Sequence, residues 1–145
     1  MEFRTFQKQW GAEFISDDVV RFRVWAEGQK ELTLRLAATD VPMTATGDGW
    51  FQADVPGVTH GTEYQFVLQD GMTVPDPASR AQARDVNGPS IVIDPRRYQP
   101  VNRDWSGRPW EETVIYELHI GTFTPEGTFR AAIDKLPYLA ELGIT

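Results

Sequence analysis

The stretch VVRFRVWA, residues 19–26, sets the fold class of this chain. It places Val20, Phe22 and Val24 on one side and two arginines and a tryptophan on the other, as in a strand with one face in a core and one in water. Segments of similar character, separated by Gly, Asp and Pro turns, lie at residues 31–37, 49–55, 63–68 and 90–94. Short alternating strands of this kind predict a mostly β fold, an antiparallel β-sandwich.

Composition limits the classes of partner. The chain has 14 Lys and Arg against 21 Asp and Glu, and this net charge of −7 without a basic run argues against nucleic acid and against anionic membranes. No stretch approaches eighteen apolar residues, so no membrane span is expected. Residues 1–10 lack the basic-then-apolar pattern of a secretory signal, and we expect a cytoplasmic protein.

The chain offers few residues for metal or redox chemistry. It has no cysteine, so neither a disulfide framework nor a cysteine-ligated metal site is expected. His60 and His119 are its two histidines, and they are too isolated in sequence to predict a zinc site. No residue cluster indicates an organic cofactor, so we expect no cofactor and no metal.

The stretch VIYELHIGTFTPEGTF, residues 114–129, has a different pattern. It opens with a nearly unbroken apolar run, which predicts a strand at residues 113–120 that is buried on both faces, as in a parallel sheet. A helix is predicted from about Phe129, with a break or a fresh turn at Pro137. Its apolar stripe comprises Phe129, Ile133, Leu136, Ala140 and Leu142. Strand followed by helix predicts the first unit of a repeating β/α structure.

Two irregular segments are rich in proline. Residues 74–89, VPDPASRAQARDVNGP, form a long loop, and such loops usually have a function or pack on another part of the protein. Residues 95–112 carry Trp105 and Trp110, which predicts a linker packed on a surface. We expect the loop to bridge the sandwich and the β/α segment that follows.

Several short motifs together resemble one family, the maltooligosyltrehalose trehalohydrolases of the α-amylase superfamily (glycoside hydrolase family 13). Each motif is weak alone, but seven in this order are specific, and they cover nearly the whole chain. The motifs are WGAEF at 10–14, VRFRVWA at 20–26, DGWF at 48–51, DPASR at 76–80, NGPS at 87–90, YELHIGTFTPEGTF at 116–129 and KLPYLAELGIT at 135–145.

The resemblance implies an immunoglobulin-like (early-set) β-sandwich of the glycogen-branching or starch-binding type at residues 1–94. It implies a packed linker at 95–112 and the incomplete start of a catalytic (β/α)8 barrel at 113–145. The family hydrolyses an α-1,4-glucosidic bond in maltooligosyltrehalose and releases trehalose. Its catalytic carboxylates belong to later barrel strands, so the resemblance carries no catalytic residue onto this chain, which is expected to be inactive alone. The implied partners are the remainder of the barrel and, in the intact enzyme, an α-glucan or maltooligosyltrehalose.

Two departures bear on this assignment. Family members read GVHGPS where this chain has DVNGPS at residues 85–90, which removes a histidine from the loop. Glycogen-branching enzymes carry Pro-x-Ala after the WA of the second strand and then a GDFN motif. Here Trp25 and Ala26 precede Glu27-Gly28-Gln29, and no GDFN occurs. The trehalohydrolases are therefore favoured, with a branching or debranching enzyme fragment as the alternative.

Trp25 and Trp50 are the candidate substrate-binding residues, because an aromatic face binds sugar rings by burying apolar C–H surface. The alternative is that Trp25 covers the barrel or the linker and that Trp50 caps the sandwich core. A self-standing sandwich module that binds α-glucan or a protein partner is the corresponding alternative function.

Glu117 and His119 form a second candidate pair. On the predicted strand they share one face, about 6.6 Å apart along the chain, close enough for acid–base work. The favoured interpretation is structural, with both side chains inside a barrel, because active sites of such barrels lie at the carboxyl ends of the strands. The loop after the strand, which holds Thr122, Phe123 and Thr124, lies at the end where a substrate cleft would form.

Overall fold

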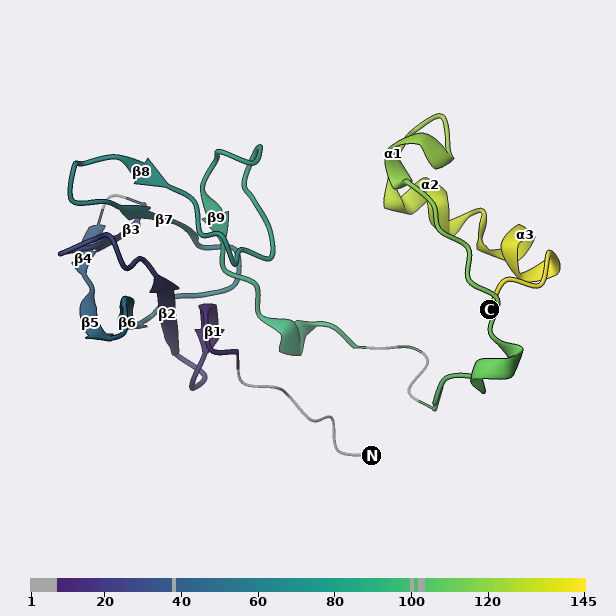
Figure 1. Cartoon of the computed structure of the whole chain (residues 1–145), viewed down its shortest axis with the longest axis horizontal. Helices are drawn as coiled ribbons and strands as arrows, with labels where there is room; N and C mark the ends of the chain where they lie inside the picture. Colours follow the sequence, from purple (N-terminus) through teal and green to yellow (C-terminus); the bar gives the residue numbers. More distant parts are fainter. Residues whose placement is uncertain (1–7, 38, 100, 102–103) are drawn as a thin grey trace. The chain divides into compact units, whose positions relative to one another are not determined.

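A computed structural model describes the chain except for residues 1–7, 38, 100 and 102–103. The chain divides into two compact units between residues 99 and 100 (Figure 1). Residues 1–7 and 38 of the predicted sandwich, and residues 100, 102 and 103 of the predicted linker, therefore lie outside the described residues.

Two antiparallel sheets face each other in the first unit, as Figure 1 shows. One sheet has the order β1-β2-β6-β5, and the other has the order β4-β3-β7-β8, with β9 also pairing with β7. Their bounds are Gly11–Phe14 (β1), Val19–Trp25 (β2), Thr33–Leu36 (β3), Thr39–Pro42 (β4), Thr44–Gly47 (β5), Trp50–Pro56 (β6), Glu63–Val67 (β7), Thr73–Val74 (β8) and Ser90–Ile91 (β9). A 3₁₀ turn η1, Pro95–Arg97, follows.

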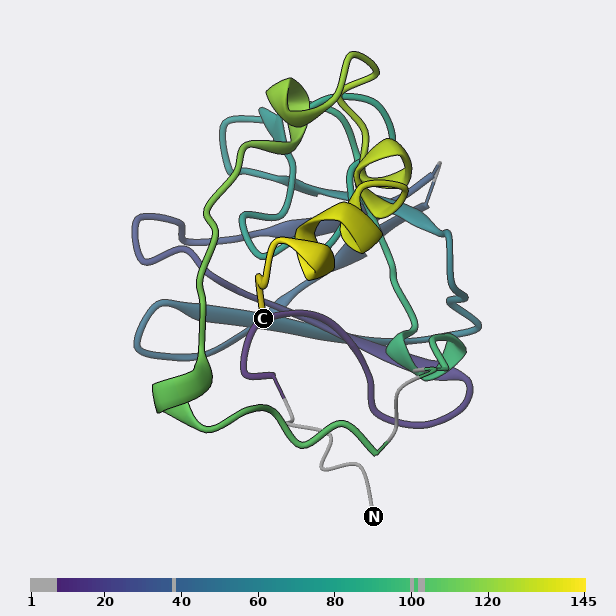
Figure 2. The same cartoon turned by 90° about the vertical axis from the view of Figure 1, so that its right-hand side faces the viewer.

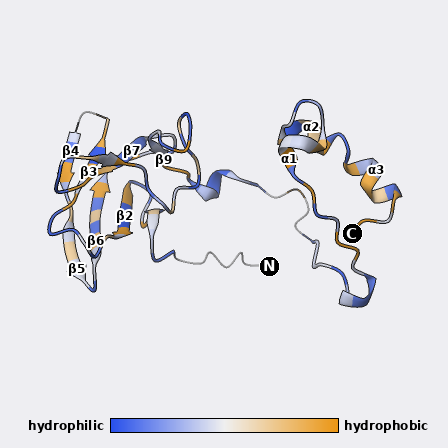
Figure 3. Ribbon diagram, turned by 45° about the horizontal axis from the view of Figure 1, so that its top comes forward, coloured by the Kyte–Doolittle hydropathy of each residue, from blue (hydrophilic) through white to orange (hydrophobic). Residues whose placement is uncertain are grey.

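The core forms between the inward faces of the long strands. Alternate residues of β2 and β6 are buried, and Figure 3 shows the corresponding change of hydropathy along these strands. The fully buried Phe22 of β2 meets Tyr64 of β7 edge-on, with 4.9 Å between ring centroids, and Tyr64 meets Phe66 at 6.0 Å. The contact between Phe22 and Tyr64 joins the two sheets, and the predicted antiparallel sandwich is confirmed.

Four strands were not predicted from the sequence. The strands β4, TDVP, and β5, TATG, lie at sheet edges and are mostly exposed, so they carry no apolar alternation. The strand β1 begins with a glycine, and β8 has two residues. Each of these four strands forms a backbone ladder with a neighbouring strand that was predicted from the sequence.

The second unit holds short helices, and the strand predicted at 113–120 is not formed. Its elements are a 3₁₀ turn η2, Trp110–Glu112, and three helices, α1 Ile120–Phe123, α2 Phe129–Ile133 and α3 Leu136–Glu141. The residues between η2 and α1 are without regular structure, because a β-strand requires a hydrogen-bonded neighbour and no described strand pairs with them. Within the described part of the chain, Val114 pairs with Thr145, whose amide donates to the Val114 carbonyl at 3.1 Å.

The helical part of this prediction is confirmed. Thr128 caps α2 by accepting a hydrogen bond from the Ala131 amide, and α2 starts at Phe129 as expected. Pro137 lies in the first turn of α3, where a missing N–H is tolerated, so the helix breaks and restarts there. The assignment of 113–145 to a barrel stays a prediction. No helix among the described residues has the length and apolarity needed to cross a membrane.

Replacing Phe22 by alanine tests the role of the core. The change leaves a cavity between the sheets and should lower the free energy of unfolding by about 3–5 kcal/mol. Phe129→Ala is the control, because Phe129 is 75% exposed in the second unit. Its effect on unfolding of the sandwich, followed by tryptophan fluorescence in urea, should stay within about 0.5 kcal/mol. Equal losses in the two variants would contradict this account of the core.

Candidate functional site

Three tryptophans line one open pocket of the first unit, with a volume of about 320 Å³. Trp10 and Trp25 are about half exposed, at 54% and 55%. We call this the tryptophan pocket, and its lining residues are Trp10, Arg23, Val24, Trp25, Trp50, Asp76, Pro77 and Ala78. Its surface is mostly apolar, with two ionisable side chains.

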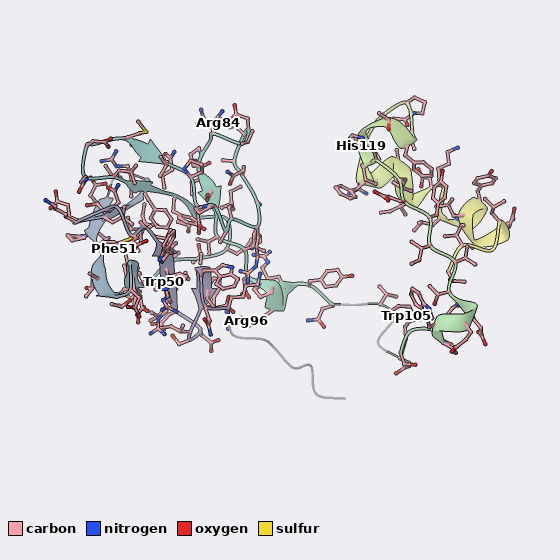
Figure 4. The ribbon with its side chains drawn as sticks, viewed as in Figure 1. Trp50, Phe51, Arg84, Arg96, Trp105 and His119 are labelled. Carbon is pink, nitrogen blue, oxygen red and sulfur yellow. The ribbon has the colours of Figure 1, made fainter. Side chains whose placement is uncertain are left out.

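The pairing of β2 with β6 brings Trp25 and Trp50 together. They are direct cross-strand partners on the outer face of the sheet, opposite the face that carries Phe22. The hairpin that leads into β6 closes with Asp48 and Gly49, whose φ angles are +50° and +78°. A two-residue turn with both φ angles positive matches the twist of the strands, and it fixes Trp50 at the first position of β6. Figure 4 shows Trp50 on this strand, next to Phe51.

The same turn holds the indole of Trp25. The Trp25 Nε1–H donates to the Asp48 carbonyl at 3.0 Å. A Cβ atom on Gly49 would lie 2.8 Å from that nitrogen and 2.9 Å from Glu27. Glycine is therefore required at residue 49 both by its positive φ and by the indole beside it.

Arg23 covers Trp50. Its guanidinium carbon lies 4.4 Å from the centre of the Trp50 ring, and its Nη1 donates to the Gln9 carbonyl at 3.0 Å. This stacking places Trp50 on the outer face rather than over the sandwich core. Further along the same face Arg21 makes a bidentate ion pair with Asp54, and its hydrogen bonds lower the pKa of Asp54.

The remaining lining comes from the loop that leaves β8. Asp76 is 3% exposed, and its carboxylate accepts hydrogen bonds from the Tyr64 phenol at 2.7 Å and from the Ala78 amide at 2.8 Å. Burial raises the pKa of Asp76, and the two hydrogen bonds oppose that rise. Burial, together with the charge of Asp76, also raises the pKa of Tyr64, so the phenol keeps its proton and remains a donor. The loop thus packs on its own sandwich, and its bridging to a barrel stays a prediction.

The second unit does not assemble a site around Glu117 and His119. Both side chains are exposed, and no contact among the described residues joins them. The expected cleft loop is partly helical instead: Thr122 and Phe123 belong to α1, and Thr124 is buried and accepts a hydrogen bond from the Gly127 amide at 3.2 Å. Because the strand predicted at residues 113–120 is not formed, Glu117 and His119 do not share the face expected for them.

Trp105 and Trp110 of the predicted linker also belong to the second unit, and Figure 4 labels Trp105 and His119 there. Their indoles are 69% and 76% exposed, and packing of this linker stays a prediction. Among the described residues, no group of three or more His, Asp or Glu is placed to hold a metal ion.

Sequence reasoning identified Trp25 and Trp50 but missed Trp10, Arg23 and the buried Asp76. Trp10 and Arg23 come together through the pairing of Gly11 with Arg23, in a strand that has no alternation to reveal it. Asp76 lies in the loop at residues 74–89, which the sequence predicts to bridge the sandwich and the β/α segment. The sequence Asp-Pro-Ala-Ser, in which an Asp side chain can accept an amide two residues later, was the available signal.

The tryptophan pocket suits a ligand with apolar faces and polar edges. Three indoles can bury C–H surface, and Arg23 brings a charged group to the pocket. Pyranose rings have this combination of surfaces. Among the described residues of its lining, Asp76 is the one carboxylate, whereas glycoside hydrolysis by retention requires a pair of carboxylates.

Comparison with known proteins identifies close relatives. The chain is 43% identical to the maltooligosyltrehalose trehalohydrolase of Deinococcus radiodurans over 86% of its own length and 20% of that relative. It is 39% identical to the enzyme of the same name from Saccharolobus solfataricus over 90% of its length and 23% of the relative. The chain thus spans about a fifth of the length of these curated relatives. No family model matches it.

Solved structures agree with the fold. A Salmonella typhimurium protein assigned to the α-amylases is 68% identical, with a TM-score of 0.93, over 97% of this chain and 24% of the other. The pullulanase SAP of group B Streptococcus, solved with maltotetraose, has a TM-score of 0.74 at 20% identity, over 97% of this chain and 23% of the other, which supports the fold alone. The resemblance inferred from the motifs is confirmed over this segment.

Replacing Gly49 by alanine should disturb the tryptophan pocket. The new Cβ meets the Trp25 indole at 2.8 Å in a backbone conformation that L-residues avoid, and a loss of about 1–2 kcal/mol in unfolding free energy is expected. Gly28→Ala is the control, because nothing lies within 4 Å of a Cβ there and its φ is not positive. The emission spectrum of tryptophan should change in Gly49→Ala and not in Gly28→Ala. Identical spectra in all three proteins would refute the contact.

Proposed function

Because the chain is related over most of its own length to the maltooligosyltrehalose trehalohydrolases, we propose that it is a segment of such a glycoside hydrolase. The intact enzyme would cleave the α-1,4-glucosidic bond that releases trehalose from maltooligosyltrehalose. Residues 1–94 would be its N-terminal sandwich, 95–112 a packed linker, and 113–145 the start of the barrel. The 43% identity to the Deinococcus radiodurans enzyme is the observation that carries this proposal.

The proposal gives the two parts of the enzyme different roles. The sandwich would contribute stability and surface, while later barrel strands would carry the carboxylates that perform hydrolysis. The remainder of the barrel is then the principal partner of residues 113–145. The exposed Ile115, Phe129 and Leu142 support this interpretation, since apolar side chains of a β/α unit are normally covered by its neighbours.

Activity measurements test the proposal directly. The 145-residue chain, incubated with maltooligosyltrehalose, should release no trehalose, whereas the longer protein that contains it should. Trehalose would be quantified by chromatography, with a branching assay on amylose in parallel. Branched product without trehalose would overturn the proposal in favour of a branching enzyme. Trehalose release by the chain alone would overturn the assignment of catalysis to later strands.

The tryptophan pocket supports a second function, binding of α-glucan by the sandwich. Trp25 is held by Asp48, and Trp50 lies beneath Arg23, so both indoles are fixed before a ligand arrives. Such preorganised aromatic groups bind with little loss of side-chain entropy. The two functions are compatible, because the sandwich would bind a glucan chain while later barrel strands would carry the residues that hydrolyse it.

Trp25→Ala tests glucan binding. The variant removes an indole that is half exposed and lines the pocket, and affinity for maltoheptaose should fall at least about tenfold, or about 1.4 kcal/mol. Trp110→Ala is the matched control, since Trp110 is exposed in the second unit. Isothermal titration calorimetry would compare both variants with the parent chain. Equal affinities for all three would contradict binding at the pocket.

A further inference from the structure

We infer that Asp76 is the positioning residue of the tryptophan pocket: its buried carboxylate fixes Pro77 and Ala78 as one wall and thereby sets the affinity of the pocket for a glucan ring. This inference rests on the glucan binding proposed above. It assigns a function to a side chain that would not itself stack on the ligand.

The carboxylate joins the pocket wall to the sandwich core. Its Oδ2 accepts from the phenol of Tyr64, which packs edge-on against Phe22 in the centre of the core. Its Oδ1 accepts from the amide of Ala78, which lines the pocket. Each oxygen therefore has one donor, one from a strand and one from the loop, so this side chain links the wall to the core.

The backbone of Asp76 is fixed as well. Its amide donates to Ser90 Oγ at 2.9 Å, and its carbonyl accepts from the Ser79 amide at 3.0 Å. Ser90 is fully buried in β9 and pairs with Tyr64 of β7, so the side chain and the backbone of Asp76 are held by neighbouring residues of one sheet. Rotation of Asp76 would break several hydrogen bonds at once.

A second anchor follows the wall in sequence. Arg80 donates to the Ala12 carbonyl at 3.0 Å and makes an ion pair with Glu13 at 3.1 Å, both in β1. Between the two anchors, Ala78 lies against Gly11, where a Cβ atom would meet it at 3.4 Å. Gly11 directly follows Trp10, so displacement of the wall would reach an indole of the pocket.

The hydrogen bonds of Asp76 indicate that its role is to position the pocket wall rather than to stabilise the fold. Burial of a carboxylate is costly, and a well-packed apolar residue often stabilises a core as much or more. The described residues nevertheless satisfy both oxygens of Asp76, and one of the two donors belongs to the pocket wall. An apolar residue could fill the space, but it could not hold the Ala78 amide.

Variants of the 145-residue chain separate these roles. Asp76→Ala removes both acceptors. Asp76→Asn retains the wall, because its carbonyl oxygen can accept from Ala78 while its amide group donates to the Tyr64 oxygen. Tyr64→Phe keeps the core ring and removes only the hydroxyl group that donates to Asp76, so it tests the link if Asp76→Ala fails to fold. Asp85→Ala is the matched control: Asp85 lies in the same loop and accepts from the Asn87 amide, away from the pocket.

Hydrogen exchange of the Ala78 amide and affinity for maltoheptaose are measured together. Asp76→Ala should speed exchange and weaken binding by about tenfold each, as expected for loss of a hydrogen bond to a charged group. Tyr64→Phe should change both in the same direction. Asp76→Asn and Asp85→Ala should stay within about twofold of the parent chain in both measurements.

The outcomes separate the inference from the function on which it rests. Unchanged Ala78 exchange in both Asp76→Ala and Tyr64→Phe would overturn positioning by Asp76. Faster exchange with unchanged affinity would overturn the dependence of binding on the wall. If the parent chain does not bind maltoheptaose, glucan binding is refuted, while faster exchange in Asp76→Ala would still support Asp76 as the residue that holds the wall.

Discussion

The pairing of β2 with β6 is the constraint on which the first unit depends. Its register turns Val24 and Phe51 into the core and places Trp25 opposite Trp50 on the outer face. A shift by one residue would exchange the two faces, exposing the core side chains and burying the indoles. Two hydrogen bonds hold β2 in this register: the Trp25 indole donates to the Asp48 carbonyl at 3.0 Å, and the Ala26 amide donates to the Gly49 carbonyl at 2.8 Å. Figure 2 shows the sandwich that contains this pair after a quarter turn of the view. The register of β2 with β6 therefore determines both the core of the sandwich and the arrangement of the pocket.

The two ionisable residues of the pocket are held by different means. Arg23 is partly buried on the outer face, where it stacks on Trp50 and donates to the Gln9 carbonyl, while its buried Nε has no hydrogen-bond partner among the described residues. Asp76 is buried and requires a donor for each carboxylate oxygen, because an unsatisfied buried acceptor costs about 1–3 kcal/mol. Arg23 is thus held by stacking and by a backbone carbonyl, whereas Asp76 is held by one donor on each carboxylate oxygen.

Sequence patterns predicted the parts of the fold that depend on burial. The alternation in residues 19–26 gave β2 correctly, because burial of one face selects both the strand and its orientation. The edge strands β4 and β5 depend on backbone pairing, which leaves little trace in their side chains. The apolar run at 113–120 carried a signal of burial, yet no described strand pairs with it. Aromatic residues such as Trp25 and Trp50 can be picked out in the sequence, but the long-range contacts that bring Asp76 into the lining of the same pocket cannot.

Exposed apolar surface has two physical origins in this chain. In the tryptophan pocket, the indole of Trp25 is fixed by a hydrogen bond to Asp48, and the ring of Trp50 by the cation above it, which is the arrangement expected of a binding surface. In the second unit, whose helix α3 carries hydrophobic residues in Figure 3, the helices have four to six residues. Helices so short are marginal in water and derive their stability from packing. The apolar residues of this unit are therefore suited to packing against further protein. Those of the pocket are suited to the reversible ligand binding proposed above.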